Sequence, residues 1–513
     1  MNGILLCAGT GKRFQPLSFT TPKPLTPVNG LPLIEHTLSL LRRGGVKRIT
    51  VVTGYLPESF SYLERKYGVE TVFNSHFADT NNNTSLAAVS ERLDGSLIID
   101  GDLFFNADFL PFVQAGKSQF ISQRTEYGEE WELMHDKAGR VLEVKKWSPS
   151  GFGMVGVSYW QGEGAALLAE ELRNCSGEEY WEDAAIRVLK RTPVYLTKVE
   201  PAFLREMDSL VDALNQGILS HANIADLLSP GFAPKPLKGL TNFTWLIKDH
   251  DKTLRSLRIP GRGTEKFIAR AEEPVIIDLI KDLVVTPETR FYAKGLKTCA
   301  FLSKHRITSF KDLNSKYFAR LAATLAKLHA IKHREGSLRP MYVRDEIAKY
   351  EGQARARREA LAADDPNGIK SSVMSLTVAT AGGGYRDWLL EKAALFDSEQ
   401  QVLSHRDLLL ENIMILNRRG EGLQLIDFEY AGFCNALWDP ASFILEANIT
   451  GKARMSFVRA CGLDSPADEL RLRQLEVLVD YIWGLWGVVN KYDDYAQMRL
   501  RRSIEKYLYI KNS

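Results

Sequence analysis

The first 160 residues alternate short apolar segments with segments of helical periodicity, and this alternation constrains the fold more than any other feature of the chain. Residues 3–8 are apolar and residues 96–100, SLIID, are typical of a buried strand, whereas residues 32–43 have helical periodicity and residues 82–93 resemble a helix. Strands that alternate with helices form a mostly parallel sheet with helices on both faces. We therefore expect an N-terminal α/β domain with a mixed, mostly parallel, Rossmann-like sheet.

The chain has 513 residues, too many for one ordinary domain. Pro, Gly and Ser become frequent toward the end of residues 217–236, and strand-like segments followed by long helices come after them. We predict an N-terminal domain of residues 1–222, a linker of residues 223–236 and a C-terminal domain of residues 237–513. The last is expected to be an α+β bilobal domain, with a small lobe of about residues 237–305 and a helical lobe of about residues 306–513.

Composition places the chain among globular proteins, with 45% hydrophobic and 25% charged residues. A net charge of +3 gives no indication of nucleic-acid binding or of attraction to anionic membranes. The five cysteines are odd in number and widely spaced, which is typical of reduced thiols. We find no apolar run of about 18 residues and no basic region of a signal peptide at the N-terminus. A cytoplasmic protein without membrane insertion is expected.

A glycine loop follows the first apolar run, in the string CAGTGKRFQPLSFTTPKPL of residues 7–25. Gly9 and Gly11 leave room for backbone N–H groups to approach phosphates, and Lys12, Arg13 and Lys23 add positive charge. A Gly-x-Gly loop alone is more often a tight turn. The whole string around the loop is more specific than the loop alone.

Two pairs of carboxylates have the spacing of residues on one face of a strand: Asp100 with Asp102, and Glu206 with Asp208. Either pair alone is more often solvated at a strand end. Two pairs in a chain that carries a triphosphate loop indicate a Mg²⁺ site, because the metal must neutralise the phosphates. The four carboxylates of these pairs are its candidate ligands.

The glycine-loop string resembles the signature of sugar-nucleotide and phosphocholine nucleotidyltransferases, with Cys7 in place of the commoner Ala and Phe14 in place of Leu. This resemblance implies that the glycines and cations of the loop bind a nucleotide and that Arg13 and Lys23 also act in catalysis. Residues 1–215 resemble the bacterial CTP:phosphocholine cytidylyltransferases more closely, in VNGLPLIEHTLSLL, NNNTSLAAV, EEWELMHD and REMDSL. The resemblance implies CTP and phosphocholine as substrates. It also implies that Asp102, Glu206 and Asp208 hold Mg²⁺. Nucleotide contacts are implied at Asn81 and Asn82, and choline contacts at Trp131, Tyr180 and Trp181. For each aromatic, burial in the core is the alternative, and the sequence does not choose between Tyr180 and Trp181.

A second constellation begins at SHRDLLLENIMIL, residues 404–416, and continues in LIDFEYA. An Asp that can accept a proton, followed by an Asn and a second Asp that can hold Mg²⁺, is the arrangement of phosphoryl-transfer enzymes. We predict that Asp407 is the catalytic base and that Asn412 and Asp427 bind Mg²⁺.

Features of protein kinases are missing around this constellation. Glu429 stands where protein kinases have Gly, and neither a glycine-rich loop motif nor an Ala-Pro-Glu sequence is present. KGLTN, residues 238–242, takes the place of the glycine loop, Arg258 follows on the next predicted strand, and Glu273 is placed to pair with Arg258 from a helix expected over residues 264–281. The sequence therefore favours a small-molecule kinase that uses ATP.

Trp483 and Trp486 are three residues apart and share one face of a helix. Such a pair is usually part of a core, but a quaternary ammonium, which has no N–H, is recognised by aromatic faces. Residues 237–509 resemble choline kinases in LRIPGRGTEK, HRDLLLEN, IDFEYAG, WDPASFILE, WGLW and DYAQ, with Arg406 as a departure. The resemblance implies a choline pocket lined by Tyr430, Glu446, Trp483, Trp486 and Tyr495.

The two halves predict consecutive reactions on one metabolite. We expect an enzyme that phosphorylates choline with ATP and then transfers CMP from CTP to phosphocholine, with Mg²⁺ as its cofactor and small molecules as its partners. Three alternatives stay open: the same steps on ethanolamine, an aminoglycoside-type kinase fused to a sugar-phosphate nucleotidyltransferase, and a fusion in which one domain is inactive.

Overall fold

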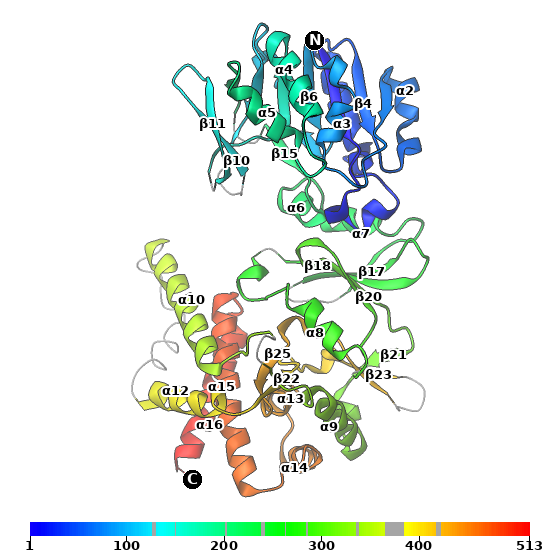
Figure 1. Ribbon diagram of the computed structural model, residues 1–513. Helices are drawn as coiled ribbons and strands as arrows, with labels where there is room; N and C mark the ends of the chain where they lie inside the picture. The colour runs from blue at the N-terminus through cyan, green and yellow to red at the C-terminus, as the bar shows by residue number, and fades with distance from the viewer. Residues whose placement is uncertain are drawn as a thin grey trace. The chain divides into compact units, whose positions relative to one another are not determined.

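The computed structural model describes residues 1–125, 130–148, 150–200, 203–237, 242–261, 263–283, 286–334, 338–364, 384–416 and 422–512. The chain forms two compact units (Figure 1). The first comprises residues 1–262 and 290–298, and the second comprises residues 263–289 and 299–513. The domain limits expected from the sequence, at residues 222 and 237, remain predictions.

The first unit contains a seven-stranded sheet of order β14-β8-β13-β6-β1-β4-β5. Its strands are β1 (Asn2–Cys7), β4 (Ile49–Thr53), β5 (Glu70–Phe73), β6 (Ser96–Asp100), β8 (Gln119–Ser122), β13 (Val157–Trp160) and β14 (Tyr195–Lys198). Only β13 runs antiparallel to its neighbours; the other pairings in this sheet are parallel. The predicted mixed, mostly parallel sheet is confirmed.

Helices cover both faces of this sheet because successive strand residues point to opposite sides. Leu5 of β1 packs in a cluster with Leu38 of α1, whereas its neighbour Leu6 packs in a cluster with Leu168 of α4. The helices of this region are α1 (Leu33–Arg43), α2 (Tyr62–Tyr67), α3 (Asn83–Ala87), α4 (Gly162–Arg173) and α5 (Trp181–Leu189).

Among the described residues, four antiparallel strand pairs accompany the sheet, two of which are β2 (Pro27–Val28) with β3 (Leu31–Pro32) and β9 (Arg124–Thr125) with β12 (Gly151–Phe152). Of the other two, one joins β7 (Leu103–Phe105) to β15 (Leu204–Glu206), and the second joins β10 (Glu130–His135) to β11 (Val141–Ser148). Figure 1 shows β10 and β11 as a hairpin that extends away from the sheet.

A second sheet has the order β16-β17-β18-β20-β19. It consists of β16 (Lys235–Leu237), β17 (Asn242–Lys248), β18 (Leu254–Pro260), β19 (Thr289–Phe291) and β20 (Lys297–Ala300). Ile247 and Leu257 from this sheet pack with Leu214 of α6 (Leu210–Asn215) and Ile224 of α7 (His221–Leu227). The stretch expected to be a linker thus contains a buried helical residue. Residues 238–241, most of the predicted phosphate-covering KGLTN segment, lie outside the described residues.

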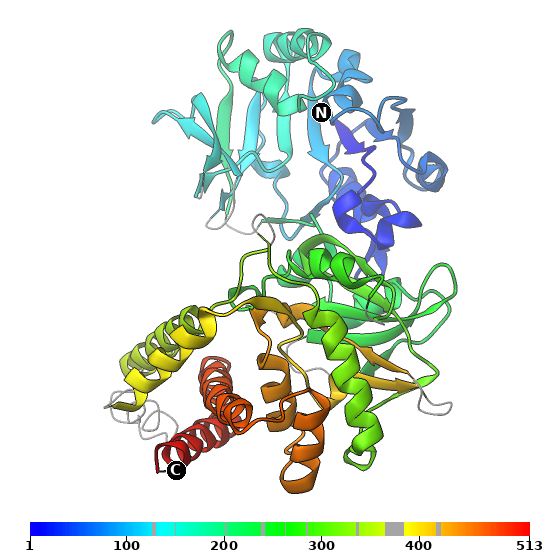
Figure 2. The same ribbon diagram turned by 60° about the horizontal axis from the view of Figure 1, so that its bottom comes forward.

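The second unit is mainly helical, and α15 and α16 lie side by side in it (Figure 2). Its helices are α8 (Glu273–Ile280), α9 (Ser315–His329), α10 (Val343–Asp364), α12 (Gly384–Asp397), α13 (Trp438–Glu446), α14 (Gly451–Ala460), α15 (Pro466–Val489) and α16 (Asp493–Asn512). Its strands are β21 (His305–Ile307), β23 (Ile413–Leu416) and β24 (Leu423–Leu425) in one sheet, and β22 (Gln401–Ser404) with β25 (Gly432–Asn435) in another. Among the helices that the structure describes, none combines the length and the apolarity of a membrane span.

Two predicted helices are too long. The helix expected over residues 82–93 ends at Ala87, because Val89 leaves the helical conformation with φ −130°. The helix expected over residues 264–281 begins only at Glu273. Pro274 lies in its first turn, the one place where a missing N–H costs no hydrogen bond, so the helix cannot extend far before it.

Candidate active sites

The carboxyl ends of β1 and β6 open into a cavity of about 540 Å³ in the first unit. This edge of an open α/β sheet is where ligands usually bind. The following predicted site residues line the cavity: Gly9, Gly11, Lys12, Arg13, Lys23, Asn81, Asn82, Asp102, Tyr180, Glu206 and Asp208.

The two glycines of the loop have different roles. Gly11 adopts φ +63°, a left-handed conformation that disfavours other residues, and its carbonyl accepts a hydrogen bond of 2.8 Å from the Ser18 hydroxyl. A Cβ on Gly9 would meet no atom within 4 Å. Gly11 is thus needed for the turn, whereas the space around Gly9 is open for a ligand.

The pairing of β7 with β15 brings the two carboxylate pairs together. Glu206 lies opposite Leu103, and the N–H of Met207 donates a hydrogen bond of 3.0 Å to the carbonyl of Asp102. Asp102, Glu206 and Asp208 each offer one oxygen atom, and these atoms lie within 4.8 Å of one another. A group of carboxylate oxygens at these separations fits Mg²⁺.

Two cations balance these carboxylates. The Lys23 ammonium lies 2.7 Å from Asp102 and 3.8 Å from Asp208, and the Arg13 guanidinium lies 2.7 Å from Asp208. Lys23 is largely buried, whereas Arg13 is exposed. Positive charge therefore surrounds the acidic group on the side of the glycine loop, as phosphate binding requires.

Two further carboxyl groups line the cavity, Asp100 and Glu182. Burial raises the pKa of both, that of Glu182 to about 7. The Asn82 amide donates a hydrogen bond of 3.4 Å to Glu182 and accepts one of 3.0 Å from the N–H of Trp181. Sequence reasoning missed Glu182, and its only signal was its place beside Tyr180 and Trp181.

The structure places the three aromatics of the N-terminal prediction differently. Tyr180 lines the cavity, and the Trp131 ring stands perpendicular to it at a centroid distance of 6.1 Å. Trp181 is buried in the hydrophobic core on the α4 and α5 face of the sheet. Tyr180 and Trp131 can therefore contact a ligand more directly than Trp181, although choline binding by any of them remains a prediction.

In the second unit, Asp407 and Asn412 form one hydrogen-bonded group. The Asn412 amide donates to the Asp407 carboxylate at 3.1 Å and to its carbonyl at 2.8 Å. The N–H of Ile426 donates to the carbonyl of Asn412, which holds Asp427 nearby. Burial, together with the charges of Asp427 and Glu429, raises the pKa of Asp407 to about 7.

Asp439 fixes the backbone that precedes Asp407, a role that sequence reasoning missed. Its carboxylate accepts hydrogen bonds from the N–H groups of His405 at 3.0 Å and Arg406 at 2.8 Å, and it lies 3.0 Å from His329. Burial opposes the charge of Asp439, but these partners hold its pKa below the ordinary value. Its signal was the Trp-Asp-Pro string at the start of α13.

Four predicted aromatics of the second unit form a continuous row of ring contacts. Centroid distances are 5.3 Å from Tyr430 to Trp483, 5.6 Å from Trp483 to Trp486 and 6.1 Å from Trp486 to Tyr495. Tyr492 stacks on Trp486 at 5.5 Å and was not predicted. Tyr430 and Trp486 are buried, and Trp483 and Tyr495 pack against the hydrophobic core of this unit, so choline binding by the row remains a prediction.

The predicted carboxylate of this pocket already has a cationic partner. Glu446 forms an ion pair with Arg499, whose guanidinium also lies 2.8 Å from Asp480 and 5.0 Å from the Tyr495 ring centroid. Arg499 is 1% exposed, and burial lowers its pKa to about 9. Choline binding by Glu446 remains a prediction, and in this structure the carboxylate is already paired with Arg499.

Arg258 and Glu273 are both buried, on β18 and at the start of α8. Arg258 belongs to the first unit and Glu273 to the second. Their predicted ion pair and their part in ATP binding remain predictions.

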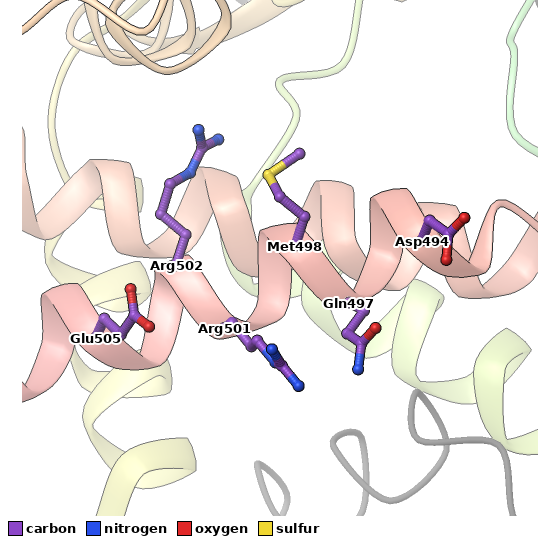
Figure 3. A pocket seen from close by; sticks show the side chains of 6 residues that line it. All are labelled: Asp494, Gln497, Met498, Arg501, Arg502 and Glu505. Carbon is purple, nitrogen blue, oxygen red and sulfur yellow. The ribbon is translucent and has the colours of Figure 1, made fainter.

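A hollow of about 450 Å³ lies along α16 and contains none of the predicted site residues. Figure 3 shows that the labelled side chains project from successive turns of this one helix. They are Asp494, Gln497, Met498, Arg501, Arg502 and Glu505. We assign no function to it.

Two family models match the chain, one in each part. A family model described as MobA-like NTP transferase domain matches residues 3–123, and one described as choline/ethanolamine kinase matches residues 236–462. The fold and sites thus define a nucleotidyltransferase domain followed by a kinase domain in one chain.

Curated relatives refine this class. The choline-phosphate cytidylyltransferase of Streptococcus pneumoniae is 34% identical over 217 residues, which are 41% of this chain and 95% of that protein. The chain belongs to the family of choline-phosphate cytidylyltransferases, extended by a choline/ethanolamine kinase domain. The 2-aminoethylphosphonate cytidylyltransferase of Lancefieldella rimae is 31% identical, over 41% of this chain and 89% of that protein.

Solved structures resemble each part. The CTP:phosphocholine cytidylyltransferase of Streptococcus pneumoniae is 32% identical, over 43% of this chain and 99% of that chain, with a TM-score of 0.41. The choline kinase of the same species is 23% identical, over 56% of this chain and 96% of that chain, with a TM-score of 0.44.

Proposed function

We propose that this chain converts choline to CDP-choline in two steps. The kinase domain phosphorylates choline with ATP, and the nucleotidyltransferase domain transfers CMP from CTP to the resulting phosphocholine, releasing pyrophosphate. The observation that carries the proposal is that each site combines acidic groups suited to phosphate transfer with aromatic rings suited to a quaternary ammonium. We place both steps in the cytoplasm, where the sequence predicts the protein and where ATP and CTP are available.

In the kinase step, Asp407 is held by Asn412 close to where the choline hydroxyl must attack. That oxygen attacks the γ-phosphorus of ATP, its proton passes to Asp407, and the bond to the ADP oxygen breaks. A pKa near 7 suits a base that must take up this proton and release it again. The ring faces of Trp483 and Trp486 orient the substrate through its ammonium group.

In the cytidylyl-transfer step, a phosphate oxygen of phosphocholine attacks the α-phosphorus of CTP, and pyrophosphate leaves. The glycine loop holds the triphosphate, and Lys23 and Arg13 stabilise the negative charge that develops. No proton acceptor is needed, because the attacking oxygen is already ionised.

Mg²⁺ suits the donor groups in both domains. Asp102, Glu206 and Asp208 would hold it in the first site, and Asn412 with Asp427 in the second. When bound, the metal neutralises phosphate charge. The residues named above bind and orient the substrates around it.

The headgroup is the finer point of the proposal. One relative is named for choline phosphate and another for 2-aminoethylphosphonate, which carries a primary amine. Tyr180, which lines the cavity and is half-exposed, favours the quaternary ammonium, which binds through ring faces alone.

Product analysis by ³¹P NMR tests the proposal. The purified protein with Mg²⁺, ATP, CTP and choline should give a transient phosphocholine signal and then a CDP-choline diester signal. Asp102→Asn should stop the reactions at phosphocholine. It removes a carboxylate that would hold Mg²⁺, so the metal would no longer neutralise the phosphate charge of CTP. Phosphocholine that accumulates in the wild-type protein would refute the second step, and the absence of phosphocholine would refute the first.

A further inference from the structure

Lys146 of β11 is brought across the hairpin to Trp131 of β10 by an irregularity in strand pairing. Glu130 pairs with Ser148 and Glu132 pairs with Lys145, so the register shifts between these two pairs. Trp131 alone on β10 therefore lies opposite two residues of β11, one of which is Lys146.

The Lys146 ammonium makes two specific contacts. It lies 3.9 Å from the centroid of the Trp131 ring, and it donates a hydrogen bond of 2.7 Å to the Asp183 carboxylate. The other oxygen of Asp183 accepts a hydrogen bond of 3.0 Å from the N–H of Tyr180, which lines the cavity. Lys146 thus belongs to the same cluster as the two aromatics next to the cavity.

These two contacts are the ones that a primary alkylammonium makes: one ring face, and one N–H donated to a carboxylate. A quaternary ammonium has no N–H and cannot use the carboxylate in this way. Lys146 therefore has the chemistry of an aminoethyl headgroup that is permanently attached to the protein.

We propose that Lys146 is a specificity-determining residue of the cytidylyl-transfer site, which occupies the ring face and carboxylate that a primary-amine substrate would need. This inference rests on the proposed function. Lys146 occupies the Trp131 ring face and the Asp183 carboxylate that a primary ammonium would use. A quaternary ammonium can still contact Tyr180, a residue that is 48% exposed. The site then selects phosphocholine over phosphoethanolamine.

Steady-state kinetics of CMP transfer from CTP to supplied phosphocholine and phosphoethanolamine tests this. The quantity of interest is the ratio of the two kcat/KM values. In Lys146→Met, the ratio of phosphocholine to phosphoethanolamine should fall by about 2- to 5-fold, mainly through a lower KM for phosphoethanolamine. Lys146→Arg keeps a cation at the position and should preserve most of the selectivity. Lys145→Met, the neighbour on the same strand, is the matched control and should leave the ratio unchanged.

The double variant Lys146→Met with Asp183→Asn identifies the partner. Asn can still accept the hydrogen bond from Tyr180 but carries no charge, so the gain for phosphoethanolamine should disappear. A gain that persists in the double variant would overturn the assignment of the subsite.

An unchanged ratio in Lys146→Met, in a protein that makes CDP-choline, would overturn the inference and leave the proposed function intact. A raised KM for both substrates would also overturn it, because Lys146 would then bind the shared phosphate. A wild-type protein that makes no CDP-choline would refute the proposed function and the inference together.

Discussion

Both predicted ammonium sites contain a cation of the protein itself, but the two cations differ in burial and in partners. Lys146 lies over Trp131 with one carboxylate partner, and its side chain is 45% exposed. Arg499 lies over Tyr495, is 1% exposed and contacts two carboxylates. An exposed ammonium on a flexible stem can move at little cost, whereas a buried guanidinium cannot leave its partners.

This difference in burial gives the two cations different roles: we infer substrate selection for Lys146 and a structural role for Arg499. In the N-terminal site, the movable cation competes with a substrate for a ring face. In the kinase domain, Arg499 belongs to a buried charge network in which Asp480 also contacts Arg502 and Lys506. A protein cation beside aromatic rings can therefore have either of two roles. An exposed cation can compete with a substrate, whereas a buried cation stabilises the fold.

The largest effect is expected from Asp407→Asn, which tests whether the two sites work separately. Loss of the base should lower the rate of choline phosphorylation by about 10²–10⁴-fold. CMP transfer from supplied phosphocholine should stay unchanged, which separate assays of the two reactions will show. A parallel fall in both activities would mean that the two sites cannot be compared as independent units.

The next largest effect is expected from Arg499→Met, which tests the architectural role of this cation. Removing it leaves Glu446 unpaired and weakens the pairing of Asp480, so the free energy of unfolding should fall by about 3 kcal/mol. Calorimetry of thermal unfolding measures the change. Combining Arg499→Met with Glu446→Gln should recover part of the loss, and a double variant no more stable than Arg499→Met would show that Glu446 is not the partner that matters.

A smaller effect is expected from Trp483→Leu, which tests whether the aromatic row binds choline. Because a desolvated cation–π contact contributes about 1–2 kcal/mol, the KM for choline should rise by about 10-fold. The KM for ethanolamine should rise less, since a primary ammonium depends more on hydrogen-bond acceptors. Equal increases for both substrates in kinase assays would assign Trp483 to packing alone.

The smallest effect is expected for the stability of Lys146→Met. An exposed ion pair contributes at most about 1 kcal/mol, so the free energy of unfolding should change by less than that. Calorimetry under the conditions used for Arg499→Met gives the direct contrast. A loss as large as that of Arg499→Met would remove the distinction between the two cations.

Local patterns in the sequence were sufficient for the sheet and for the position of the glycine loop beside the cavity. The strands β1 and β6 and the turn of the glycine loop are set by residues that are adjacent in the sequence. For these features the sequence pattern and the structure therefore agree. The limits of α8 were misjudged because helical periodicity continues through residues 264–281, whereas Pro274 restricts where a helix can begin.

The sequence by itself determined the fold class of the N-terminal part and the family, and it predicts two sets of phosphate-transfer residues. Only the tertiary structure decided which ring of Tyr180 and Trp181 faces the cavity, and that Asp439 holds the backbone before Asp407. It alone placed Lys146 beside Asp183, and Arg499 beside Glu446. The physical reason is that periodicity reports neighbours within one strand or helix, whereas these contacts join residues from different elements, which only the packed chain brings together.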